Sequence, residues 1–122
     1  MFVLPFSAFG RGPGGDLCRR LGIQIETCRS WNDLTLAALR RNRDGALVEE
    51  AARLDRVLAS GERVVLHALL HALDFDAVAD DLADGRTWWR MSIVGGPHRD
   101  AVLACLVRRD DSLSSSDEEI PG

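Results

Sequence analysis

The chain has 122 residues, of which 46% are hydrophobic and 28% are charged, and its formal net charge is −4. This length and composition predict one soluble globular domain that can bury a core without disulfides or metals. They exclude a membrane-spanning helix, which needs roughly 20 apolar residues, and the first residues lack the basic region of a secretion signal.

The first fifteen residues are predicted to lie outside the main domain as an N-terminal arm and connector. Residues 2–9 are apolar and are expected to form a short edge strand or an extended arm, because Pro5 excludes a central strand position. Residues 10–15 contain four glycines and a proline, which is typical of a flexible connector.

The next segment allows two interpretations. In the first, residues 16–21 form a short helix, Gly22 makes a turn, and a second helix follows. In the second, residues 23–28 alternate between apolar and polar as in a strand. A capping box that begins at Ser30 would then start a helix over residues 31–41.

Two helices in the middle of the chain are predicted most clearly. Residues 46–59 have the apolar spacing of an amphipathic helix. Residues 61–73 are apolar almost all round, with His67 and His71 as the exceptions between Val64 and Leu73. Such a helix is normally surrounded by its own protein, so we expect this one at the centre of the domain.

The remainder of the chain is less uniform. Residues 74–82 are expected to form a short helix, whereas residues 87–94 have the content of a strand. Pro97 is well placed in the first turn of a final helix. The competing interpretation is a hairpin that pairs 87–94 with 101–107.

The predicted fold is mainly α, with a compact helical domain around the buried helix 61–73 and an extended N-terminal arm. The globular domain covers residues 16–109, and the acidic residues 110–122 are expected to form a disordered tail. The alternative is an α+β fold with a small antiparallel sheet built from residues 23–28, 87–94 and 101–107.

Residues 15–31 offer one short motif. A small residue at Cys18, the turn glycine Gly22 and the apolar Ile23 are spaced as in a helix-turn-helix. This stretch resembles the motif that opens MerR-type regulators, and the resemblance implies that the segment after the turn enters the major groove of DNA. The DNA-binding residues in this alternative are Arg19, Arg20, Gln24, Glu26 and Arg29.

Two adjacent tryptophans provide the predicted partner-binding surface. Trp88 and Trp89 cannot both face inward from one element, and Arg86 and Arg90 flank them. Exposed tryptophan beside arginine is the composition of interface hot spots. Nearby aspartates would steer the approach of a partner with a basic surface. The predicted partner-binding surface of this chain therefore also includes Asp80 and Asp81.

Motifs for catalysis are missing from the sequence. The glycine-rich stretch lacks the Lys-Ser/Thr step of a phosphate-binding loop, and no Gly-x-Ser-x-Gly elbow occurs. His67 and His71 share a helix face, but His98 and Cys105 would complete a zinc site only if the fold brought them over, so no metal or cofactor is predicted. Three cysteines, an odd number, indicate reduced thiols and a cytoplasmic location.

The sequence therefore predicts a small non-enzymatic regulatory or inhibitory protein that binds a macromolecular partner. A protein partner is favoured, a membrane is not, and self-association stays open. The alternative is a DNA-binding transcriptional regulator that uses the motif at 15–31. Charge is divided unevenly along the chain, with an excess of +4 over residues 11–43 and of −8 over the remainder, which is typical of two different partner surfaces.

Overall fold

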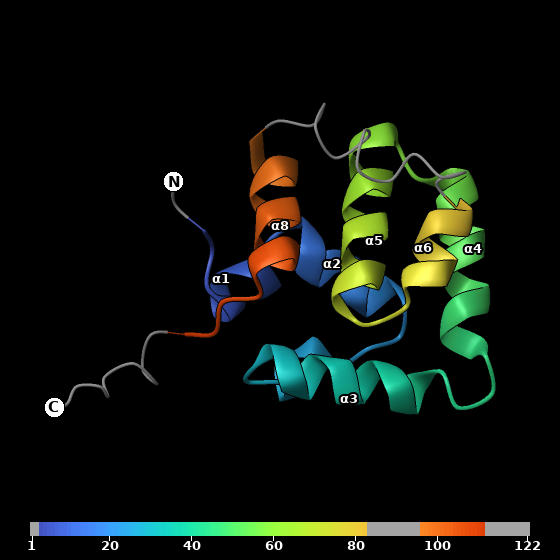
Figure 1. Cartoon of the computed structure of the whole chain (residues 1–122), viewed down its shortest axis with the longest axis horizontal. Helices are drawn as coiled ribbons and strands as arrows, with labels where there is room; N and C mark the ends of the chain where they lie inside the picture. The colour runs from blue at the N-terminus through green and yellow to red at the C-terminus, as the bar shows by residue number, and fades with distance from the viewer. Residues whose placement is uncertain (1–2, 83–95, 112–122) are drawn as a thin grey trace, which may run out of the picture.

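A computed structural model describes residues 3–82 and 96–111 of the chain (Figure 1). These ranges contain seven α-helices and one 3₁₀ turn, and no strand occurs in them. The predicted mainly helical fold is therefore confirmed. The alternative sheet is wrong because residues 101–107 are helical, while the expected strand at 87–94 lies outside the described residues. None of the described helices combines the length and the apolarity that crossing a bilayer requires.

Helix α5 (Ser60–Ala72) occupies the centre of the domain, as the apolar pattern predicted. Every residue from Val64 to Leu70 is buried. Helix α8 (Gly96–Val107) packs along one side of α5, while α6 (Asp76–Leu82) and α4 (Ala46–Val57) lie on the other side (Figure 1). Because neighbours cover α5 on several sides, an all-round apolar surface is what this position requires.

The extended arm is confined to residues 3–5, since the chain is already helical in α1 (Phe6–Gly10). Phe6 and Phe9 lie three residues apart on this short helix, and both are buried. Both rings contact Trp31, with centroid distances of 5.5 Å from Phe6 and 4.7 Å from Phe9. The helix forms because it places both phenylalanines on one face, which a strand would not do.

The glycine-rich stretch is a packing contact, so the flexible connector predicted there is wrong. Helix α2 (Pro13–Arg20) begins with Pro13 in its first turn, and Gly14 and Gly15 are buried. A Cβ atom on Gly15 would lie 1.8 Å from the carbonyl oxygen of Gly10, and one on Gly14 would lie 2.1 Å from the Phe9 ring. Gly15 is needed because α1 and α2 meet backbone to backbone there, and Gly14 because the Phe9 ring covers it.

The chain turns at Gly22, where φ is +87°, and enters a 3₁₀ turn, η1 (Ile25–Thr27). The strand expected over 23–28 is therefore wrong. Helix α3 (Trp31–Arg41) follows, and the side chain of Ser30 accepts a hydrogen bond from the backbone N–H of Asp33 at 3.1 Å, as the capping box predicted. Figure 1 shows α3 lying across one end of the domain, below α5 and α6.

Two residues assigned to the disordered tail belong to the folded domain. The Asp110 carboxylate accepts a 2.9 Å hydrogen bond from the backbone N–H of Trp31, at the start of α3. The Asp111 carboxylate accepts one of the same length from the N–H of Ser7, at the start of α1. Asp110 and Asp111 thereby join the beginnings of two helices. Residues 112–122 lie outside the described residues.

Candidate functional site

Most of the predicted partner surface lies beyond the part of the chain that the structure describes. Arg86, Trp88, Trp89 and Arg90 all fall between the described ranges. Asp80 and Asp81 are on α6, and both are exposed to solvent. The Asp80 carboxylate lies 3.1 Å from Nε2 of His71, so one of the two aspartates also makes a contact within the domain.

The two histidines of α5 connect it to its neighbours. His67 is fully buried, and its Nε2 lies 2.6 Å from the carboxylate of Asp55 on α4. His71 pairs with Asp80 on α6, so both histidines share one face of α5, as their spacing predicted. No group of three or more potential metal ligands occurs within residues 3–82 and 96–111. In this geometry the histidines hold helices together.

The residues of the helix-turn-helix alternative lie on α2, on η1 and beside them. Arg19 is held by three acceptors, which are the carboxylates of Glu26 and Asp16 and the carbonyl oxygen of Gly10. Arg20, Gln24 and Arg29 are exposed. The segment that would enter the major groove contains only the single 3₁₀ turn 25–27, and the next α-helix begins at Trp31.

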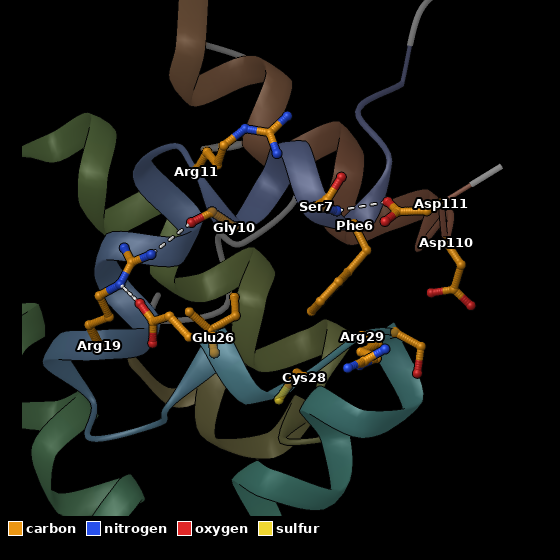
Figure 2. Close-up of a pocket in the computed structure, with 12 residues that line it drawn as sticks. Phe6, Ser7, Gly10, Arg11, Arg19, Glu26, Cys28, Arg29, Asp110 and Asp111 are labelled. Carbon is orange, nitrogen blue, oxygen red and sulfur yellow. Dashed lines mark hydrogen bonds and ion pairs between the residues drawn. The ribbon is translucent and has the colours of Figure 1, made fainter. Parts of the chain in front are cut away.

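Several of the same residues surround a hollow of about 650 Å³ (Figure 2). It lies between α1, η1, the segment that leads into α3, and Asp110 with Asp111. Its apolar lining comes from Phe6, Ile25 and the half-buried Cys28. Figure 2 shows Phe6 projecting from α1 toward the segment that carries Cys28 and Arg29.

Some of the charged groups around this hollow already have ion-pair or hydrogen-bond partners among the described residues, and others do not. The Arg19 guanidinium holds the pKa of Glu26 below its usual range, so this carboxylate stays ionised and paired. Asp110 and Asp111 accept backbone N–H bonds at helix starts. Arg29 forms no ion pair with any residue of the described ranges. Burial raises the pKa of the Cys28 thiol, which therefore stays protonated near neutral pH.

A second surface is the outer face of α3. Leu36 and Leu39 are 44% and 54% exposed, although they are large apolar side chains in a helix of the domain. Arg40 is exposed one turn further along the same face, and Arg43 is exposed just beyond the end of the helix. Leu36, Leu39 and Arg40 are spaced i, i+3 and i+4 and are neighbours on the helix surface, while Arg43 follows in the turn after α3. The surface that these four side chains form, which we call the α3 face, contains no carboxylate.

The α3 face runs toward a smaller hollow of about 350 Å³. This hollow lies between the first turn of α3 and the end of α8, where Val107 is 53% exposed. Thr35 and Asn32 contribute polar groups to its α3 side. The exposed Val107 therefore lies at a recess that Asp74 and Arg108 also line.

Comparison with family models, with characterised proteins and with solved structures gives no match to this chain. Function must therefore be argued from the surfaces themselves. Sequence reasoning missed the α3 face, although Leu36, Leu39 and Arg40 have the spacing of one helical stripe. It missed the hollow as well, because four separate segments of the chain meet there only in the fold.

Proposed function

We propose that this chain is a small non-enzymatic regulatory or inhibitory protein that binds another protein through the α3 face. The supporting observation is the exposure of Leu36 and Leu39 side by side, with Arg40 and Arg43 beside them. Isolated apolar side chains on a surface are ordinary, but adjacent ones beside arginine match the composition of interface hot spots.

Burial supplies the driving force of this interaction. Covering a Leu side chain completely is worth roughly 1.5–3 kcal/mol, so covering two half-exposed leucines is worth about that much together. This gain alone is insufficient for tight binding, since association itself costs several kcal/mol. The arginines must therefore contribute, and arginine does so best when it pairs with carboxylates in a bidentate geometry.

The charge of the α3 face determines the kind of partner. Arg40 and Arg43 make no ion pair within the described ranges, so an apolar surface that carries carboxylates complements them. The α3 face contains no carboxylate, so the same face of a second copy offers no partner for these arginines. We therefore favour a different, acidic protein over self-association through this face.

The experiment is a comparison of matched variants in capture from the native host, followed by cross-linking to map the contact. The double variant Leu36→Ala/Leu39→Ala removes the proposed face. Val57→Ala is the control, because Val57 is 64% exposed on α4, away from the α3 face. Circular dichroism checks that both variants are folded.

We expect one protein to be retained by both the wild type and Val57→Ala and to be lost from the double variant. The same protein should cross-link to residues of α3. Its retention should fall as salt is added, since exposed charges are screened within about 10 Å at 0.1 M. Equal retention by the double variant and the control would show that the α3 face is not the binding surface. The predicted surface around Trp88 and Trp89 stays a prediction beside this one.

A further inference from the structure

The hollow bordered by α1 and residues 25–30 is held open by contacts on two sides. On one side, Arg19 of α2 bonds both Glu26 beside the hollow and the carbonyl oxygen of Gly10 at the end of α1. On the other side, Asp111 is bonded to the start of α1 and Asp110 to the start of α3. A volume of about 650 Å³ is within the range of small-molecule pockets, roughly 300–1,000 Å³.

The floor of the hollow is apolar and fixed from below. Phe6 is only 3% exposed, and its ring packs edge-on against Trp31 with an interplanar angle of 74°. Ile25 is 5% exposed and belongs to the same hydrophobic core. Side chains held in this way need little reordering when a ligand arrives, which lowers the cost of binding.

Three arginines and three carboxylates line the hollow, and two of the arginines, Arg11 and Arg29, have no ion pair in the described ranges. Glu26 is paired with Arg19, while Asp110 and Asp111 already occupy the helix starts where another anion would bind. Arg29 is different, because its guanidinium has no ion pair in the described ranges while its backbone N–H is fixed by a 2.9 Å bond to Asp33. Figure 2 shows Arg29 beside Cys28, at the edge of the apolar floor.

We infer that this hollow binds a small amphipathic carboxylate, with its apolar body on Phe6, Ile25 and Cys28 and its carboxylate on Arg29. Arginine recognises a carboxylate through two parallel N–H bonds, which makes a planar monoanion a good match for the Arg29 guanidinium. A cation would leave Arg29 unpaired. The inference does not depend on the α3 face, since none of the four side chains of that face lines the hollow.

The test is a titration of the full chain with decanoate below its micelle concentration, followed by calorimetry and by backbone NMR shifts. Decanol and decylammonium have the same apolar chain and serve as the neutral and cationic arms. A hydrogen bond to a charged group is stronger than one between neutral groups, so decanoate should bind at least about tenfold more tightly than decanol. Decylammonium should bind most weakly, and the shifts should centre on residues 6–10 and 25–30.

Two variants separate the charge from the apolar floor. Arg29→Gln should reduce decanoate affinity about tenfold and leave decanol unchanged, while Arg43→Gln makes the same charge change outside the hollow and should alter neither. Cys28→Trp should block both ligands by filling the hollow. If that variant melts early, alkylation of Cys28 in the folded wild type with a bulky maleimide provides the same block.

Three results would overturn the inference. Equal affinities for decanoate and decanol would show that no cation recognises the carboxylate. Equal effects of Arg29→Gln and Arg43→Gln would show that Arg29 acts only through the net charge of the protein. Shifts centred away from residues 6–10 and 25–30, or unchanged binding after Cys28 is blocked, would place the ligand elsewhere.

Discussion

The response of this protein to alkaline pH should be controlled by its cysteines. The chain has no tyrosine and no lysine, so few groups other than its thiols titrate between pH 8.5 and 10.5. Cys18 and Cys105 are buried in the core, and burial raises the pKa of both thiols well above the ordinary value. Arginine stays protonated throughout this range.

Whether alkaline pH stabilises or destabilises the fold depends on whether the folded or the unfolded chain releases its thiol protons at lower pH. Because the folded pKa is raised, the thiols of the unfolded chain ionise at lower pH than those of the folded chain. The contribution of these thiols to the free energy of unfolding is therefore fully present below the ordinary thiol pKa, roughly 8.5. It is lost progressively as pH rises from there toward the pKa of the folded state. Each fully buried thiol removes about 1.4 kcal/mol per pH unit over this interval.

The expected loss is large compared with the stability of a small domain. For Cys18 and Cys105 together it reaches about 5 kcal/mol between pH 8.5 and 10.5. A domain of this kind is stable by roughly 5–15 kcal/mol in total. Cys28 is only partly buried and should contribute less. The free energy of unfolding should thus fall steeply in a range where many proteins also titrate tyrosine and lysine.

The assay is urea unfolding followed by circular dichroism at pH 7.5, 8.5, 9.5 and 10.5 in the presence of a reductant. Cys18→Ala and Cys105→Ala should each remove close to half of the slope above pH 8.5, whatever their effect at neutral pH. Cys28→Ala is the matched control and should change the slope least. A wild-type stability that is constant up to pH 10.5 would refute the reasoning, as would a slope controlled by Cys28.

Three further predictions concern the core, the helix contact and the DNA alternative. Leu69→Ala should lower the free energy of unfolding by about 2–5 kcal/mol in urea denaturation, because Leu69 is fully buried at the centre of α5. Gly15→Ala should lower the melting temperature far more than Gly12→Ala, since the nearest atom to an added Cβ is at 1.8 Å in the first case and 3.8 Å in the second. If the chain binds duplex DNA as the alternative predicts, Arg29→Ala should weaken binding and added salt should reduce it steeply in a mobility-shift assay; no shift at low salt would exclude that function.

Local patterns predicted most of the described helices. The all-round apolar run gave α5, the amphipathic spacing gave α4, and the capping residue Ser30 gave the start of α3. These signals are local because helix periodicity and capping depend on neighbours within a few residues. Where the competing interpretation was a strand, as at residues 101–107, the packing of α8 against α5 decided in favour of the helix.

The first fifteen residues could not be predicted from such patterns. Glycine is equally typical of a flexible link and of a close contact between backbones, and only the fold shows that Gly15 meets Gly10. Asp110 and Asp111 were missed for the same reason. An acidic residue near the end of a chain resembles a solvated tail until its hydrogen-bond partners, 79 and 104 residues away, are known.

The hollow borders the segment that leads into α3, whose outer face is the second proposed site, and the two should influence each other only weakly. Arg29 and Ser30 border the hollow just before α3, and Leu36 lies about 10 Å further along the axis at 1.5 Å per residue. A carboxylate on Arg29 would neutralise one positive charge near the α3 face. In water the energy between unit charges 10 Å apart is about 0.4 kcal/mol, which is close to a factor of two in affinity.

Saturating decanoate should therefore weaken an acidic partner bound at the α3 face by no more than about twofold at low salt. At 0.15 M salt, where the Debye length is about 8 Å, the effect should be smaller still. The measurement is the Kd of that partner with and without decanoate at both salt concentrations. A tenfold change that persists in salt would contradict this estimate, because screened charges cannot produce it. It would mean that the ligand and the partner compete for the same atoms or that α3 moves when the hollow is filled.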